Sequence, residues 1–266
     1  HPMRPAASGL DQAEYTMAHV FHINGKIDGA FVASSGKNMG AFKGVGYPED
    51  IGAFYRICDY DAWAWTAHGR FPTNTPGFSV TKYEDKCGFR TISTCSLKFD
   101  NVRVPAANLV GEEGKGYIYA MKTLDKSRAC VGALAVGIAR RALDEALAFV
   151  KERVTFGAPV AKRQGIQWMI ADMATKIEAS RCLVSHANDL QSKGLPFSKE
   201  AAMAKMFATQ SAMEVCTDAI QLMGGKGYMK EDCVEKCFRD IKAYCIFEGT
   251  NQIQKMVISG AVLSGK

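Results

Sequence analysis

The stretch LDKSRACVGALAVGIARRALDEALAFVKER, residues 124–153, decides the fold of the second half of the chain. Its apolar residues recur every three or four positions, at Leu124, Val131, Leu134, Ile138, Ala142 and Phe149. That period matches the turn of an α-helix with one apolar face. We therefore expect a long amphipathic helix that starts after Tyr117 and ends near Arg153.

Toward the C-terminus the same period continues in two further long segments. The apolar residues of the first are Ile166, Met169, Ile170, Met173, Ile177 and Val184, and those of the second are Met203, Met206, Phe207, Met213 and Ile220. Breaks at 194–196 and 224–227 separate them from their neighbours, and Ser198 is a candidate N-cap. A short helix near 233–244 and a last one over 250–263 complete an antiparallel bundle.

Toward the N-terminus the period changes from helical to alternating. Trp63 and Trp65 suit one face of a strand, and residues 78–80 are expected to form a second strand. Residues 95–104 alternate, with a turn or bulge at Asp100 and Asn101. The glycine loop 111–116 reads as a linker, since it lacks the spacing of a phosphate-binding loop. We predict an α+β fold in which an N-terminal, mostly antiparallel β domain (residues 1–112, divergent over 1–75) precedes a C-terminal antiparallel α-helical bundle (113–266).

Composition excludes several classes of function. The formal charge of +6 is spread along the chain without a basic cluster, so no nucleic-acid partner is expected. Nine cysteines without Cys-x-x-Cys spacing argue against a disulfide framework, and His19 and His22 are too weak a pair to predict a metal site. No apolar run is long enough for a transmembrane segment, and no signal peptide is visible.

Residues 246–254, IFEGTNQIQ, hold the strongest candidate for chemistry. Apolar neighbours should desolvate Glu248 and raise its pKa, which would make the carboxylate a useful proton acceptor near neutral pH. Gly249 permits close approach of a backbone or ligand, and Thr250 is a candidate N-cap for the last helix. The alternative interpretation is an ordinary helix start with an exposed glutamate.

Five motifs in order resemble those of the acyl-CoA dehydrogenases, across residues 75–263. They are 99–105 with 109–111 (FDNVRVP and LVG), 124–128 (LDKSR), 153–157 with Gln164 (RVTFG), 221–228 (QLMGGKGY) and 247–254 (FEGTNQIQ). The resemblance implies an FAD-dependent enzyme of the short- or medium-chain type, in which Glu248 is the catalytic base. In other branches of the family the base lies on the helix of Asp125 and Arg128, but here Ser127 stands there and no glutamate is near.

The resemblance also assigns the binding residues. Those implied for FAD are Arg153, Thr155, Phe156, Gln164, Gln221, Gly224, Gly225, Thr250 and Gln252, and those on the substrate side are Asp125, Arg128 and Gly249. By itself Arg153 also fits an exposed helix end, and the pair Gly224 and Gly225 also fits a helix C-cap. No metal is implied.

The expected function is α,β-dehydrogenation of a fatty acyl-CoA in fatty acid β-oxidation, a branch of lipid metabolism. Electron-transfer flavoprotein is the implied acceptor, a homodimer or homotetramer the implied assembly, and the mitochondrial matrix the implied location. The family's N-terminal helical domain has no counterpart in the sequence, and residues 37–75 align with nothing in the family. The alternative is therefore a non-catalytic paralogue that acts as a structural or assembly subunit of a mitochondrial complex.

Overall fold

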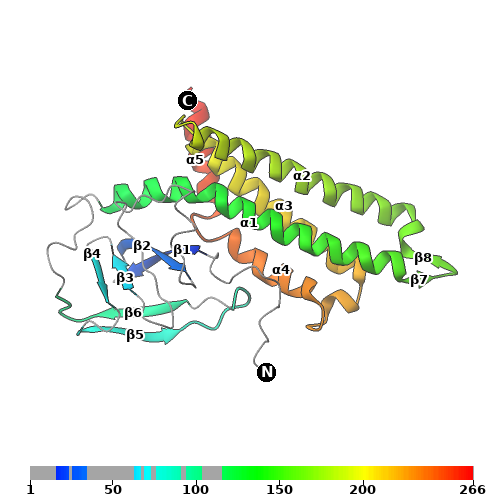
Figure 1. Cartoon of the computed structure of the whole chain (residues 1–266), viewed down its shortest axis with the longest axis horizontal. Coiled ribbons are helices and arrows are strands. Elements are labelled where there is room, and N and C mark those ends of the chain that lie inside the picture. Colours follow the sequence, from blue (N-terminus) through cyan, green and yellow to red (C-terminus); the bar gives the residue numbers. More distant parts are fainter. Residues whose placement is uncertain are drawn as a thin grey trace. The chain divides into compact units, whose positions relative to one another are not determined.

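A computed structural model of the chain describes residues 16–23, 26–34, 63–66, 69–72, 76–90, 94–103 and 116–265 (Figure 1). These residues fall into two compact units, which are described separately. The first comprises residues 1–85 and 91–123, and the second comprises 86–90 and 124–266. The domain boundary predicted near residue 112 lies outside the described residues and stays a prediction.

The described strands of the first unit form antiparallel pairs, in agreement with the predicted β character. The pairs are β1 (Thr16–Ile23) with β2 (Lys26–Ser34), β3 (Trp63–Thr66) with β4 (Gly69–Pro72), and β5 (Phe78–Tyr83) with β6 (Cys95–Phe99). Phe78 opposes Phe99 in the last pair, with ring centroids 5.2 Å apart. The strand predicted over Trp63 and Trp65 is thus confirmed.

The chain bends at Asp100 and Asn101, where a turn or bulge was predicted, and the strand before the bend is shorter than expected. Asn101 has a φ of 51°, and the Asp100 N–H donates to the Gly77 carbonyl at 2.8 Å. Strand β6 ends at Phe99, so Val102 lies beyond it, and Val104 is outside the described residues. A left-handed residue cannot continue the ladder, which explains why the alternating pattern overstated the strand.

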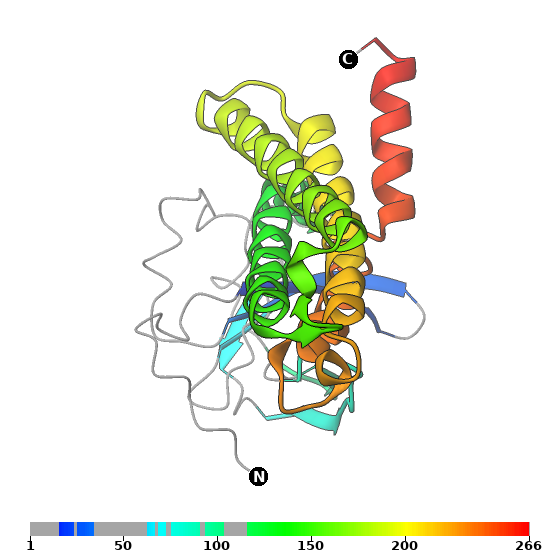
Figure 2. The ribbon, with the colours of Figure 1, turned by 90° about the vertical axis from the view of Figure 1, so that its right-hand side faces the viewer.

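All five predicted helices are present. They are α1 (Gly116–Glu152), α2 (Gln164–Ser192), α3 (Ser198–Met223), α4 (Cys233–Tyr244) and α5 (Asn251–Leu263). A hairpin of β7 (Val154–Thr155) and β8 (Ala158–Pro159) joins α1 to α2. In the second unit the long helices alternate in direction, and α5 runs at a steep angle to them (Figures 1 and 2).

Small residues allow the long helices to pack closely. A Cβ added to Gly132 of α1 would lie 2.9 Å from Val184 Cγ2 of α2 and 3.3 Å from the Ala204 carbonyl oxygen of α3. Buried alanines are frequent in α1 and α3, among them Ala135, Ala139, Ala142, Ala146, Ala201, Ala208 and Ala212. Close packing of this kind makes the bundle a rigid support for side chains at its ends and sides.

Two helix starts test the predicted caps. Thr250 caps α5, because its hydroxyl oxygen accepts the Ile253 N–H at 3.3 Å. Ser198, predicted as an N-cap, is instead the first residue of α3, and Phe197 precedes it without a side-chain cap. The prediction of Ser198 was therefore wrong by one residue, because Phe197 already takes the non-helical position.

The described residues contain neither a candidate transmembrane helix nor a candidate metal cluster. No helix there has the length and apolar character that crossing a bilayer requires. No group of three or more metal-ligating side chains is arranged there to hold an ion. His19 and His22 lie in β1, where only the backbone is described.

Candidate active site

Glu248 lies on the short loop between α4 and α5, in an unusual backbone conformation. Its φ is +54° and that of Gly249 is +85°, so two consecutive residues are left-handed. Only 3% of Glu248 is exposed. A left-handed residue other than glycine is uncommon, and such strain persists only where the surroundings impose it, often at functional sites. The interpretation of Glu248 as an exposed residue is therefore wrong.

Ser127 of α1 reaches the Glu248 carboxylate. The Ser127 hydroxyl donates to Glu248 Oε2, and it also lies 3.2 Å from the Leu124 carbonyl oxygen. One hydroxyl has a single proton, and an ionised carboxylate is the stronger acceptor. Burial and the Glu248 charge raise the pKa of the Cys130 thiol, on the same helix, to about 11. A serine hydroxyl and a neutral thiol thus share this side of α1 with the carboxylate.

Arg128, the residue after Ser127 on α1, is a buried cation. It is 4% exposed, and its Nη1 donates to the Asp125 carboxylate one turn earlier. Its Nε has no hydrogen-bond partner among the described residues. Burying an unpaired donor costs free energy, so this nitrogen is suited to an acceptor brought by a ligand or another chain. The structure thereby brings Asp125, Arg128, Glu248 and Gly249, four of the predicted residues, into one region.

A buried polar network, which the sequence analysis did not predict, holds the backbone of the Glu248 loop in place. Lys205 of α3 is 0% exposed, and its Nζ donates to the Gly249 carbonyl at 2.9 Å and to Asn251 Oδ1 at 3.0 Å. The Thr209 hydroxyl donates to the same Asn251 oxygen at 3.1 Å. Gln254 Nε2 donates to the carbonyls of Gly249 at 2.9 Å and Glu248 at 3.3 Å. Both left-handed residues are therefore held through their carbonyl oxygens.

Burial also changes the charge behaviour of Lys205. Loss of hydration lowers the pKa of its ammonium to about 8, although the nearby Cys245 and Glu248 act in the opposite direction and Arg128 adds to the lowering. The group is protonated at neutral pH and gives charge-assisted hydrogen bonds, which are stronger than neutral ones.

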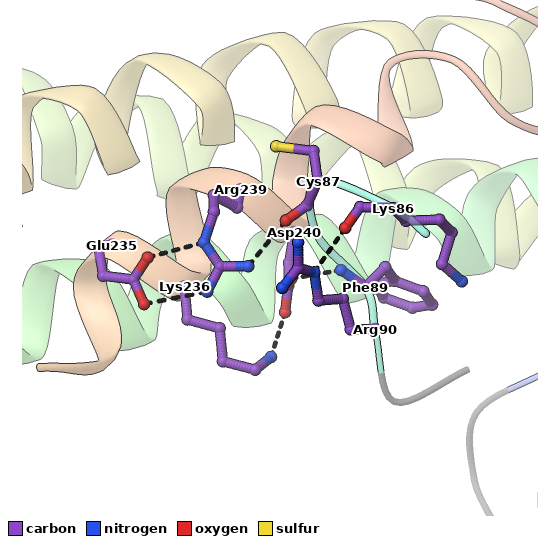
Figure 3. Close-up of polar contacts among 8 residues, drawn as sticks. All are labelled: Lys86, Cys87, Phe89, Arg90, Glu235, Lys236, Arg239 and Asp240. Atoms are coloured by element: carbon purple, nitrogen blue, oxygen red, sulfur yellow. Dashed lines mark hydrogen bonds and ion pairs between the residues drawn. The ribbon is translucent and has the colours of Figure 1, made fainter. Parts of the chain in front are cut away.

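Residues 86–90, far from α4 in sequence, pack against that helix (Figure 3). The Phe89 N–H donates to Asp240 Oδ1 at 2.5 Å, and Lys236 pairs with Oδ2 of the same carboxylate. A Cβ on Gly88 would lie 2.3 Å from the Arg239 carbonyl oxygen, so only glycine allows this approach.

The Phe89 ring extends this contact to the candidate base. It is 7% exposed, lies edge-on to Tyr244 at 5.3 Å and is 6.4 Å from Phe247, the residue before Glu248. Tyr244 and Phe247 are themselves 4.9 Å apart. Phe89, Tyr244 and Phe247 thus form an aromatic cluster beside the Glu248 loop.

Asp240→Asn is expected to destabilise the protein by about 1–2 kcal/mol, because the buried Phe89 N–H keeps only a neutral acceptor and the ion pair with Lys236 is lost. Chemical denaturation measures the change. The control is Asp144→Asn, whose ion pair with Arg140 is exposed on both sides, and it should stay within about 0.5 kcal/mol. Equal effects of the two variants would contradict the structural role of Asp240.

The hairpin between α1 and α2 carries a second group of predicted residues. Phe156 and Gly157 form its two-residue turn with φ values of 49° and 77°, the pattern of a type I′ turn. Phe156 is 96% exposed, and the Arg163 guanidinium lies 5.2 Å from its ring centroid. Arg163 Nη2 also donates to the Thr155 carbonyl at 2.6 Å. A fully exposed aromatic ring held in a left-handed turn is suited to contact with another molecule.

Other predicted residues lie at the same end of the bundle. Arg153 follows α1 and is exposed, Gln164 is the first residue of α2, and Gln221 is an exposed residue in the last turn of α3. Gly224 caps α3 with a φ of 60°, and no atom lies within 4 Å of a Cβ added to Gly224 or Gly225. These glycines end the helix and also leave space beside it. The C-cap interpretation and the cofactor-binding interpretation are therefore compatible.

The structure does not bring all the predicted cofactor residues together. Thr250 and Gln252 lie beside Glu248, on the loop that Lys205 of α3 contacts. Gln221 lies on the same helix, 16 residues after Lys205, which is about 24 Å away at 1.5 Å per residue. The predicted residues thus fall at two places, one around Glu248 and a second at the open end of α3. Arg163 belongs to the second end, and the sequence did not predict it.

Comparisons with known proteins place this architecture among the flavoprotein dehydrogenases. The family model described as "Acyl-CoA dehydrogenase, C-terminal domain" matches residues 114–263. The chain belongs to the acyl-CoA dehydrogenase family, which confirms the resemblance of its motifs. Members of this family are FAD-binding flavoproteins.

Individual proteins agree with this assignment. "Acyl-CoA dehydrogenase" of Bacillus subtilis (strain 168) is 50% identical over 192 residues, 72% of this chain and 51% of that protein. "Short-chain specific acyl-CoA dehydrogenase, mitochondrial" of Rattus norvegicus is 44% identical over 192 residues, 72% of this chain and 47% of that protein. The butyryl-CoA dehydrogenase structure from Megasphaera elsdenii matches with a TM-score of 0.72 and 47% identity, over 74% of this chain and 52% of that chain. The chain spans about half the length of these relatives.

Proposed function

We propose that this chain carries out α,β-dehydrogenation of a fatty acyl-CoA thioester, with Glu248 as the base that removes the α-proton. The observation that supports the proposal is a buried carboxylate on a left-handed turn. Ser127 donates to the Glu248 carboxylate, while Lys205 and Gln254 donate to backbone carbonyls of the turn. The α-proton passes to the Glu248 carboxylate, a hydride leaves the β-carbon, and a carbon–carbon double bond forms. Bound FAD would supply the hydride acceptor.

The donors at the open end of the bundle suit a flavin dinucleotide. The Arg153 guanidinium offers a fork of donors to a pyrophosphate, and the amides of Gln164 and Gln221 suit adenine, ribose or phosphate. Phe156 would cover a ring system, with Thr155 beside it, and Gly224 and Gly225 allow close approach of the ligand. Thr250 and Gln252 would meet the flavin next to Glu248.

The distance between the two ends supports an assembly of more than one copy. One chain holds the base and the open end about 24 Å apart along α3, so a cofactor bridging two chains would use the base-side residues of one and the open end of the other. We propose a homodimer or homotetramer on this basis. Light scattering of the flavin-loaded protein would test it.

Three further proposals concern the electron acceptor, the metabolic role and the location of the protein. Electrons taken up by a flavin must leave it, and electron-transfer flavoprotein is the proposed acceptor. Fatty acid β-oxidation is the proposed role. A mitochondrial matrix location is proposed from the rat relative's name, while the Bacillus relative shows that the family is not confined to mitochondria.

The purified protein is expected to show a visible flavin band that bleaches on addition of a short- or medium-chain acyl-CoA, because dehydrogenation reduces the flavin. Free CoA is the control and should leave the band unchanged. A protein that stays colourless after incubation with FAD would instead favour the non-catalytic paralogue, and its stable association with other proteins would then be sought. The dehydrogenase names of the relatives do not favour that alternative.

A further inference from the structure

Two cysteines on α4 and an arginine on α1 form a cluster that the proposed function does not use. Cys233 is the first residue of α4, and Cys237 follows one turn later. The Arg141 Nε–H donates to Cys233 Sγ over 3.5 Å, and Arg141 also pairs with Glu145 at 2.5 Å. Both cysteines are half-buried. Cys233 is therefore reachable from solvent and in contact with a cation.

The groups around Cys233 favour its thiolate. The Cys237 thiol, one turn along the helix, lowers the pKa of Cys233 to about 6, with Arg141 acting in the same direction, while burial and Glu145 oppose the shift. The same interaction, with burial, raises the pKa of Cys237, and burial raises that of Cys216 on α3 to about 12. The position of Cys233 at a helix N-terminus adds to this stabilisation.

We propose that Cys233 is a nucleophilic modification site that takes small disulfides by thiol–disulfide exchange. The Cys233 thiolate attacks one sulfur of R–S–S–R, the S–S bond of the reagent breaks, and R–S⁻ leaves and takes a proton from water. The product is a mixed disulfide at Cys233, and excess thiol reverses the reaction. This inference is independent of the dehydrogenase proposal.

Helix geometry assigns different roles to the two cysteines. Cβ atoms four residues apart on a helix are about 5–6 Å apart. A disulfide requires its two Cβ atoms to lie about 3.5–4.5 Å apart. An intact α4 thus keeps Cys237 from forming a disulfide with Cys233, so the small disulfide is the partner of Cys233.

The test compares Cys233 with Cys182, an exposed cysteine on α2, within the same protein. The 266-residue chain is treated with glutathione disulfide between pH 6 and pH 8, and the modified peptides are counted by mass spectrometry. A thiol beside a cation keeps more of its thiolate as the pH falls than a thiol without such a neighbour. Because the Arg141 contact favours the Cys233 thiolate, the ratio of the Cys233 rate to the Cys182 rate is expected to rise by about tenfold or more from pH 8 to pH 6.

Variants identify the source of the effect. Arg141→Gln and Cys237→Ala should each reduce the rise in this ratio, and Arg140→Gln, next to Arg141 but exposed and paired with Asp144, should not. If the rates of Cys233 and Cys182 fall in parallel in the unaltered protein, the proposal is overturned, whatever the variants do.

Discussion

Glu248→Gln is expected to leave flavin binding intact and to slow bleaching of the flavin by acyl-CoA by about 100-fold to 10,000-fold, the usual contribution of a general base. Glutamine has nearly the same shape, and its amide oxygen can still accept the Ser127 hydroxyl, so the loop should keep its conformation. The amide has no basic oxygen to take the α-proton. Stopped-flow absorbance measures the rate, and the absorbance of the isolated protein measures flavin content.

The matched control is Glu231→Gln, the same change at an exposed glutamate. It should leave the rate unchanged. A Glu248→Gln protein that bleaches within about tenfold of the parent would show that another group removes the proton, and the proposed mechanism would fail.

The helical half of the fold could be predicted because its information is local. Apolar residues with a period near 3.6, and glycine breaks such as that at Gly194, are sufficient to place α1 to α5. The misplaced cap at Ser198 and the overlong strand to Val104 were errors of boundary, which depend on the conformation of single residues such as Phe197 and Asn101.

The candidate site was only partly predictable, because its supporting contacts join distant segments. Glu248 could be identified from its neighbours and motif, but the Ser127 contact spans 121 residues and the Phe89 contact with Asp240 spans 151. Lys205 sits among alanines and methionines at a core position of α3, which was the available signal. The cofactor-binding residues were predicted from the family resemblance alone. That resemblance did not show that they form two groups, one near each end of α3.

Lys205→Met is expected to slow flavin bleaching by about 10-fold to 100-fold while flavin binding persists. Methionine fills a similar volume but offers no donor to Gly249 or Asn251. Hydrogen bonds from a charged group contribute about 1.5–3 kcal/mol, and a tenfold change in rate corresponds to about 1.4 kcal/mol. Since a left-handed residue costs about 1–2 kcal/mol, Glu248 should leave its position in part of the molecules. The expected signature is a lower maximal bleaching rate with little change in the acyl-CoA concentration that gives half of it.

Thr209→Val is the control, because it removes one donor to Asn251 while Lys205 continues to hold both acceptors. Its rate should stay within about fivefold of the parent, since a neutral hydrogen bond contributes about 0.5–1.5 kcal/mol. Equal losses in the two variants would assign the effect to general loosening of α3 rather than to the ammonium.

The pH dependence of stability separates the charge of Lys205 from its packing. Its pKa is about 8 in the folded protein, below the ordinary value of 10.5, so between these pH values the unfolded chain binds more protons. The unfolding free energy of the parent should therefore rise from pH 8 to pH 10 relative to that of Lys205→Met, which has no group there to titrate. Chemical denaturation of both proteins across this range measures the difference. A constant difference would mean that Lys205 titrates as an ordinary lysine, and the argument from its buried charge would fail.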